Sequence, residues 1–268
     1  MYKRQGFENL SISYSDYDIY QNKLDEVELV AIDGRLDSIR EIKTDDEIEK
    51  LRVAESIGDA AFKYILGFLK EGITEKEVAL ELEYYMKKNG AEGLSFDTIA
   101  ASGRNSSMPH AIPSDKKLEA GDFLTMDFGC IYDGYCSDMT RTLLFGNVSE
   151  EHMRIFNLVQ ESQDKAIAAI RPGVMAKDVE DAHRAVFLRE NLDDYALRGL
   201  GHGIGLQIHE CPRIVIGNET VLKPGMIFTV EPGLYFPNDC GVRTEDDVLV
   251  TENGVENLSH TPHEIHIG

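Results

Sequence analysis

A ten-residue segment that occurs twice is the feature that most constrains the fold of this chain. LEAGDFLTMD (residues 118–127) and LKPGMIFTVE (222–231) align without a gap, and each copy ends in an acid, Asp127 or Glu231. Each copy combines a glycine turn with an apolar run, a pattern that predicts a β-strand. Similar helical segments precede both copies in the same order, EGITEKEVALELEYYM (71–86) and PGVMAKDVEDAHRAVF (172–187). The sequence therefore predicts two pseudo-equivalent halves, each with helices followed by strands that end in acids.

A second predicted strand follows each copy and brings another acid. In the first half, Asp138 lies beyond a turn region with two glycines, which predicts a β-hairpin over residues 118–141; in the second, GVRTEDDVLVTENG supplies Glu245. Carboxylates at the ends of buried strands are unfavourable unless their charge is compensated. A divalent metal with hard oxygen ligands is one solution, and an ordinary ion pair with Arg141 or a lysine is the other.

GLGHGIGLQIHE (199–210) adds imidazole groups to these acids. His202 lies between glycines, which allow close approach of the backbone, and His209 follows seven residues later. A lone histidine among glycines is commonly a turn residue, but beside four carboxylates a ligand is favoured. Four acids and one imidazole suit two metal ions that share bridging carboxylates.

The ordered motifs MDFG, SDMTRT, GHGIGLQIHE, VEPGLY and GVRTEDDVLVTENG resemble those of the pita-bread metallopeptidases, the group of aminopeptidase P, prolidase, methionine aminopeptidase and the metal-free creatinase. The resemblance runs from about Thr44 to the C-terminus, and within the group the chain is similar to the Xaa-Pro peptidase branch. It implies an α+β pita-bread fold with two pseudo-symmetric halves around a dinuclear metal site. The implied reaction is hydrolysis of Xaa-Pro bonds, at peptide N-termini or in dipeptides, by a metal-bridged hydroxide.

The resemblance also implies metal ligands. Asp138 and Glu245 are similar to the bridging carboxylates, Asp127 to a ligand of one ion, and His202 with Glu231 to the ligands of the other. The expected cofactor is two divalent ions, manganese first, with cobalt, iron or zinc as alternatives.

Four residues receive catalytic or positioning roles. Glu231 is expected to take up the proton of the attacking water, and His209 with His110 of PHAIPSD to stabilise the oxyanion and the nitrogen side of the scissile bond. Arg243, two residues before Glu245, is expected on the same strand face, where it could hold a ligating carboxylate. A plain structural ion pair is the equal alternative for Arg243.

Two positions depart from the pattern of the family. Arg198 stands where many members carry a histidine, and Gln207 replaces a common acid; both departures bear on substrate length. Two other functions stay open, a methionine aminopeptidase-like enzyme and a non-catalytic pita-bread module that binds peptides or proteins.

Composition excludes several classes of partner. A net charge of -21 disfavours nucleic acids and anionic membranes. Neither a membrane-spanning stretch nor a secretion signal is evident, so a cytoplasmic location is expected by default. The four cysteines lack CxxC spacing and are expected to be free thiols.

Residues 1–43 resemble the remnant of the N-terminal domain and linker of Xaa-Pro peptidases, whereas residues 44–268 are expected to form the catalytic domain. Proline-containing peptides are the expected partners, with a homodimer if the natural protein carries that N-terminal domain. The opening MYKRQ is what GTG TAT AAG AGA CAG would encode, which matches a transposon end used as a sequencing adaptor. We therefore expect residues 1–5 to be an artefact and the natural protein to be longer, with an ordinary polar N-terminus as the alternative.

Local signals predict the elements of the expected catalytic domain. Thr44 or Asp45 can cap a helix that reaches about residue 70, and Thr74 with Glu77 forms a capping box for a helix ending at Lys88. A strand is expected over 95–101, a long helix from 149 or 150 to about 170, and another over 178–190.

Overall fold

The computed structural model describes residues 3–32 and 34–267, and the chain divides into two units, Met1–Glu41 and Ile42–Gly268. In the smaller unit, β1 (Lys3–Phe7) pairs in parallel with β2 (Val27–Ala31), and α1 (Tyr14–Lys23) connects them. A short helix, α2 (Asp37–Arg40), follows. Of the five residues assigned to an adaptor, the first two lie outside the described residues and the other three belong to β1.

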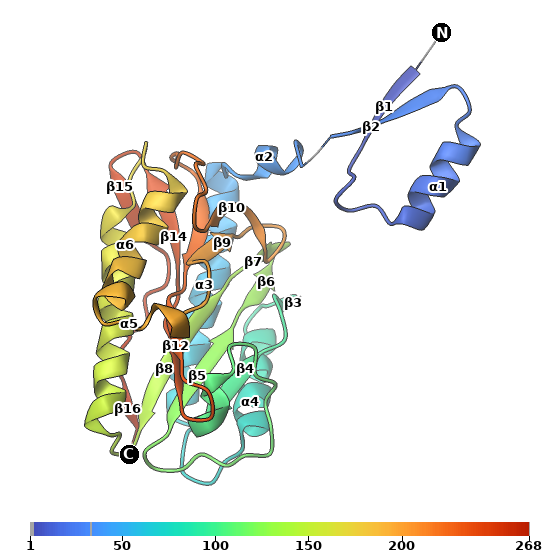
Figure 1. Ribbon diagram of the computed structural model, residues 1–268. Coiled ribbons are helices and arrows are strands. Elements are labelled where there is room, and N and C mark those ends of the chain that lie inside the picture. The colour runs from blue at the N-terminus through green and yellow to red at the C-terminus, as the bar shows by residue number, and fades with distance from the viewer. Residues whose placement is uncertain (1–2, 33, 268) are drawn as a thin grey trace. The chain divides into compact units, whose positions relative to one another are not determined.

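The larger unit contains two successive sets of helices and strands (Figure 1). The first set is α3 (Asp45–Leu66), α4 (Glu75–Lys88), β3 (Gly93–Leu94), β4 (Ile99–Ser102), the 3₁₀ helix η1 (Gly103–Ser107), β5 (Phe123–Phe128), β6 (Cys130–Tyr132), β7 (Tyr135–Cys136) and β8 (Met139–Phe145). The second set is α5 (Glu150–Ala169), α6 (Ala176–Arg189), η2 (Asp193–Tyr195), β9 (Gly201–Gly203), β10 (Glu210–Ile214), β11 (Ile227–Val230), β12 (Gly233–Tyr235), β13 (Gly241–Arg243), β14 (Asp246–Thr251), β15 (Gly254–Asn257) and β16 (His266–Ile267).

The backbone connections before the second helix of each set show that the two halves are structural repeats. The Gly72 N–H donates to the Leu118 carbonyl at 3.0 Å, and the Gly173 N–H donates to the Leu222 carbonyl at 2.9 Å. Both glycines have φ of +88°, a value that disfavours side chains. The same loop therefore ties the start of a helix to the start of the copied segment in each half.

Helix caps confirm the predicted starts of three helices. Thr44 caps α3 and Thr74 caps α4, each in a capping box with the glutamate three residues later, and Ser149 caps α5. Helix α3 ends at Leu66 rather than near residue 70, because the N–H groups of Gly67 and Phe68 donate to carbonyls three residues back, at Tyr64 and Ile65, and the regular α-helical pattern stops. Helix α6 begins at Ala176, two residues earlier than predicted, where the Ala176 N–H donates to the Thr220 carbonyl.

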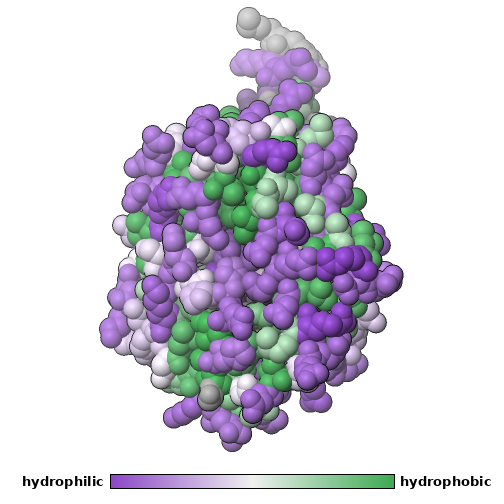
Figure 2. Space-filling model, turned by 90° about the vertical axis from the view of Figure 1, so that its left-hand side faces the viewer, coloured by the Kyte–Doolittle hydropathy of each residue, from purple (hydrophilic) through white to green (hydrophobic). Residues whose placement is uncertain are grey.

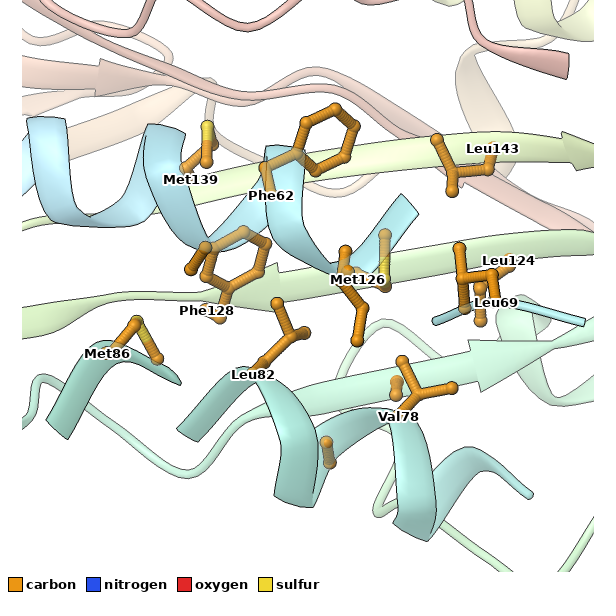
Figure 3. Packing of buried hydrophobic residues seen from close by; sticks show 14 of the residues in the cluster. Phe62, Leu69, Val78, Leu82, Met86, Leu124, Met126, Phe128, Met139 and Leu143 are labelled. Atoms are coloured by element: carbon orange, nitrogen blue, oxygen red, sulfur yellow. The ribbon is translucent and has the colours of Figure 1, made fainter. Parts of the chain in front are cut away.

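Each half buries its own hydrophobic core between helices and sheet. Figure 3 shows Leu82 of α4 directed towards Met126 and Phe128 of β5, and Phe62 of α3 directed towards β8, between Met139 and Leu143. These side chains are at most 1% exposed. A comparable cluster in the second half joins α5 and α6 to β11 and β14. In each half, therefore, burial of apolar side chains packs two helices against the sheet.

The two main sheets carry the copied strands at corresponding places. Their strand orders are β16-β8-β5-β4 and β10-β9-β11-β14-β15, with β5 antiparallel to β8 and β11 antiparallel to β14. The predicted simple hairpin over 118–141 is wrong in one respect, because its tip leaves the β5–β8 ladder and forms β6 and β7 in a separate sheet with β3. At that bend, a Cβ on Gly129 would lie 1.9 Å from the Ser137 carbonyl oxygen. The strand expected over 95–101 is only partly present, because β4 begins at Ile99 and residues 95–98 belong to no strand.

The surface is largely polar on the face drawn in Figure 2. Figure 2 shows a face on which hydrophilic residues predominate and hydrophobic residues form smaller patches between them. Among the described residues, none of the helices combines the length and the apolar character needed to cross a membrane.

Candidate metal centre

Four acids lie at matching ends of the copied strands. Asp127 is the penultimate residue of β5 and Asp138 directly precedes β8, whereas Glu231 directly follows β11 and Glu245 directly precedes β14. Because each pair of strands is antiparallel, the end of the first strand and the start of the second meet at one edge of the sheet. The duplication thus brings two acids from each half to one pocket.

His202 reaches the same place from β9, next to β11. Its two glycine neighbours allow this strand to lie close to other backbone. A Cβ on Gly201 would lie 1.9 Å from the Thr229 carbonyl oxygen, and one on Gly203 would lie 2.2 Å from the Cys211 carbonyl oxygen. The His202 N–H donates to the Thr229 hydroxyl, and that hydroxyl donates to Glu231 at 3.1 Å.

The ligand-type atoms of this group converge closely. One side-chain oxygen each of Asp138 and Glu245 and one ring nitrogen of His202 all lie within 4.8 Å of one another. His202 Nε2 lies 3.6 Å from Asp138 Oδ2 and 3.4 Å from Glu231 Oε1. These separations exceed ordinary hydrogen bonds, and they leave room for a cation between the donor atoms.

Several oxygens of the group have no protein partner. Asp127 Oδ1, Asp138 Oδ1 and Glu245 Oε1 are buried and accept no hydrogen bond within the described residues. Buried carboxylate oxygens without partners are strongly unfavourable, and a divalent cation would satisfy them. The residues present therefore fit a divalent metal, with oxygen donors in excess and one imidazole.

The pKa values record the same crowding of negative charge. Burial raises the pKa of Asp138 well above its usual range, and the neighbouring Glu245 and Asp127 raise it further. Burial and then Glu231 raise the pKa of Glu245, and burial followed by Asp127 raises the pKa of Glu231 to about 7. Burial lowers the pKa of His202 to about 4, so its imidazole is neutral and able to ligate near pH 7.

Arg243 is the cation that contacts this group directly. Its Nη2 lies 2.5 Å from Asp127 Oδ2, and its Nε donates to the Thr140 hydroxyl, which in turn donates to Glu245. Arg243 ends β13, whereas Glu245 lies in the link to β14, so the expectation of one shared strand face is wrong. The Arg243 guanidinium nevertheless contacts a carboxylate of the group, that of Asp127.

Arg141 does not compensate the aspartates of the hairpin. Its Nη2 lies 2.6 Å from Asp246 Oδ1, and its Nη1 donates to the carbonyls of Thr140 and Glu245. Both side chains of the Arg141–Asp246 pair are 0% exposed. The ion pair weighed as an alternative for Asp127 and Asp138 is therefore absent at Arg141, which instead joins β8 to β14.

Two acids behind Asp138 were missed by sequence reasoning. The Asp138 N–H lies 3.2 Å from Glu55 Oε1 and 3.2 Å from Asp247 Oδ2, and both carboxyl groups are buried. Burial raises the pKa of Glu55 to about 7, with Asp59 contributing. An available signal was the position of Glu55, four residues after Leu51 on the apolar face of α3.

A pocket of about 860 Å³ opens above the group, lined by all five expected ligands together with His110, His209, Arg198 and Arg243. The His209 ring packs edge-on against His202, with ring centroids 4.3 Å apart, and burial lowers the pKa of His209. Arg243 Nη1 donates to the Pro109 carbonyl at 3.0 Å, which fixes the loop that carries His110. Gln207 is not among the lining residues; its N–H donates to Glu210 at 2.9 Å.

Comparison with known proteins gives a consistent result. The model of metallopeptidase family M24 matches residues 49–252. The Xaa-Pro dipeptidase of Pyrococcus furiosus is 44% identical over 255 residues, which cover 95% of this chain and 73% of the relative. A Bacillus subtilis protein described as an uncharacterized peptidase is 43% identical over 263 residues, or 98% of this chain and 74% of the relative.

Solved structures show the same likeness. An Xaa-Pro dipeptidase from Bacillus anthracis superposes with a TM-score of 0.96 at 42% identity, covering 99% of this chain and 75% of that one. An X-Pro aminopeptidase from Thermotoga maritima gives a TM-score of 0.91 at 36% identity, with 99% and 76% covered.

Fold and site together define a peptidase whose chemistry depends on a divalent metal ion. The chain belongs to metallopeptidase family M24, and its mixed α and β architecture is the pita-bread fold that the motifs predicted.

Proposed function

We propose that this protein hydrolyses the bond before proline in dipeptides or at the N-termini of short peptides, using two divalent metal ions. The observation that carries the proposal is the convergence of four acids, three of them buried, and His202 in one pocket, with several of their oxygens unpaired. Relatives named Xaa-Pro dipeptidase that are 40% and 44% identical support the choice of substrate.

Asp138 and Glu245 would hold both ions, Asp127 would hold one of them, and His202 with Glu231 would hold the other. Manganese is the proposed metal, because the donor set is rich in hard carboxylate oxygens. When bound, the ions would activate a water molecule and polarise the peptide carbonyl. The protein contributes the fixed positions of these donors, which Thr140, Thr229 and Arg243 orient through hydrogen bonds.

Glu231 is proposed to hold the proton that the attacking water loses. It is the most accessible of the four acids, with 24% of its side chain exposed to the pocket, and its pKa of about 7 in the metal-free protein suits proton uptake. His209 and His110 line the same pocket and would donate hydrogen bonds to the carbonyl oxygen and the nitrogen side of the bond.

A test of the proposal is product analysis by mass spectrometry with Ala-Pro, Ala-Pro-Ala and Met-Ala-Ser. Each peptide is incubated with Mn²⁺ and, separately, with a chelator. Metal-dependent release of alanine from either proline peptide is expected, and the preferred length distinguishes a dipeptidase from an aminopeptidase. Preferred cleavage of Met-Ala-Ser would favour the methionine aminopeptidase alternative. Bound metal without turnover of any peptide would favour a binding module.

The roles of the individual site residues, the homodimer, the cytoplasmic location and the assignment of residues 1–43 to a domain remnant stay predictions. The oligomeric state is measurable by light scattering of the purified chain.

A further inference from the structure

A second cluster of metal-binding side chains lies outside the pocket, where the first turn of α5 meets the turn between β12 and β13. One ligand-type atom each of His152, Asp239 and Cys240 lies within 4.8 Å of the others. None of these residues lines the pocket of the candidate metal centre. The cluster combines an imidazole, a carboxylate and a thiol, a donor set suited to zinc and similar ions.

The separations in this cluster match those between ligands of one tetrahedral ion. Zinc lies about 2.1 Å from nitrogen or oxygen ligands and about 2.3 Å from sulfur, which places tetrahedral N and O ligands about 3.4 Å apart and S and O ligands about 3.6 Å apart. His152 Nε2 lies 3.5 Å from Asp239 Oδ1, and Cys240 Sγ lies 4.0 Å from Asp239 Oδ2. The two contacts use different oxygens of Asp239, so a rotation of this exposed carboxylate together with small side-chain shifts would bring one donor atom of each residue to one ion.

His152 is held in place by packing more than by hydrogen bonds. Its ring centroid lies 5.1 Å from that of Phe123, and its Nδ1 is buried without a hydrogen-bond partner among the described residues. Its contact with Asp239 is longer than a good hydrogen bond. The ring is therefore oriented towards the cluster without strong interactions that a metal would have to break.

Charge and access are also compatible with a cation. The N-terminus of a helix disfavours cations, but the first turn of α5 carries Glu150 and Glu151, which offset that effect. Asp239 and Glu151 both lie near enough to Cys240 to raise the pKa of its thiol, after burial as the largest cause. The Asp239 side chain is 63% exposed, so an ion can enter from solvent along this carboxylate.

We propose that His152, Asp239 and Cys240 bind one zinc-like divalent ion at a site separate from the candidate metal centre, with water or Glu151 as the fourth ligand. Binding would exchange the thiol proton for a metal–sulfur bond and release that proton to solvent. The ion would tie the β12–β13 turn to α5.

Cobalt is the probe that separates the two sites, because a thiolate bound to Co²⁺ gives an intense near-ultraviolet charge-transfer band. The five ligands proposed for the candidate metal centre include no cysteine. The chelator-treated full chain is titrated with Co²⁺. The band is expected to saturate when one ion per chain has bound at this site, in addition to the ions taken up by the candidate metal centre, and to disappear when Zn²⁺ is added. Cys240→Ser and His152→Gln are expected to abolish the band, and Asp239→Asn to weaken Co²⁺ binding at this site at least tenfold.

Cys211→Ser is the matched control, since Cys211 lies in β10 and is not part of the cluster, and this variant should keep the band. Asp239 is exposed, so the Asp239→Asn result remains informative even where a substitution of buried Cys240 impairs folding. Absence of the band in the unmodified chain, its persistence in Cys240→Ser, or its loss in Cys211→Ser would each overturn the proposal. Because the readout is a sulfur band, failure of the proposed peptidase function leaves it unaffected.

Discussion

Arg243 and Asp127 form a buried ion pair, with Nη2 and Oδ2 2.5 Å apart, at the centre of a group of four acids. The same guanidinium donates to the Tyr235 hydroxyl at 2.6 Å and to the Pro109 carbonyl. One planar cation therefore fixes a proposed metal ligand and the loop of His110 together. A lysine could not reproduce these contacts, because its ammonium is a single point of charge on a flexible chain.

We expect Arg243→Lys to lower kcat/KM for the cleaved proline peptide about 10- to 100-fold, because Asp127 and the His110 loop lose their common anchor. Steady-state kinetics with Mn²⁺ measures the change. Arg154→Lys is the control, since Arg154 is exposed and pairs with Glu151 on the surface. Equal activity of both variants would show that Arg243 is only a structural ion-pair partner.

Glu231→Gln is expected to lower kcat about 100- to 10,000-fold, the range for loss of a general acid or base. Because Glu231 is also a proposed ligand, elemental analysis of the variant must accompany the kinetics. Retained metal with lost turnover supports the proton-transfer role, whereas lost metal assigns Glu231 to binding alone. Glu219→Gln, at an exposed carboxylate paired with Lys177, serves as the control.

Arg141→Met is expected to destabilise the protein by about 3–5 kcal/mol, because it leaves the buried Asp246 carboxylate without its cation. Arg141 lowers the pKa of Asp246 to about 2 although burial alone would raise it, so this acid is ionised at neutral pH. Urea unfolding followed by circular dichroism measures the loss. Arg154→Met, at an exposed pair, should cost less than about 1 kcal/mol; a similarly small loss at Arg141 would contradict the prediction.

The metal-free protein is expected to become more stable as the pH is lowered from 8 to 6.5. Burial raises the pKa of Glu231 and of Glu55 to about 7, whereas the unfolded chain has ordinary carboxyl pKa values of about 4.3. Between these pH values the folded state binds more protons, so the free energy of unfolding falls as pH rises, by on the order of 1 kcal/mol per group. His202, with its pKa lowered to about 4, opposes this trend as the pH approaches the unfolded-state histidine pKa of about 6.5. At pH 6.5 its opposing contribution is about 0.4 kcal/mol, which is smaller than the combined gain from the two carboxyl groups.

Thermal unfolding in the presence of a chelator measures this dependence, and the melting temperature should rise by a few degrees at the lower pH. The double variant Glu55→Gln/Glu231→Gln should show a flatter profile over the same window. A melting temperature that increases with pH in the metal-free chain would refute the assignment. Metal binding should show the opposite pH dependence, since the ions compete with protons for the same oxygens.

Much of the architecture follows from local sequence signals. The helix cap at Thr44 or Asp45, the capping box at Thr74, the duplicated strand segments and the acids at their ends were all predicted from the sequence. Antiparallel pairing then requires an acid at the end of one strand to meet an acid at the start of the next. The shared pocket of Asp127, Asp138, Glu231 and Glu245 was predictable for this reason.

Other features were decided only by tertiary structure. The sequence suggested Arg141 or a lysine as the ion-pair partner of the hairpin aspartates and Arg243 as a group that could hold a ligating carboxylate. In the fold Arg141 pairs with Asp246, and Arg243 pairs with Asp127. The bend at Gly129 and the carboxyl groups of Glu55 and Asp247 behind Asp138 were likewise unforeseen. Helix caps and strand alternation depend on residues a few positions apart, which sequence spacing records. The partner of a long side chain such as arginine depends on which groups are buried with it and on which distant segments lie beside it. Only the packed fold determines those contacts.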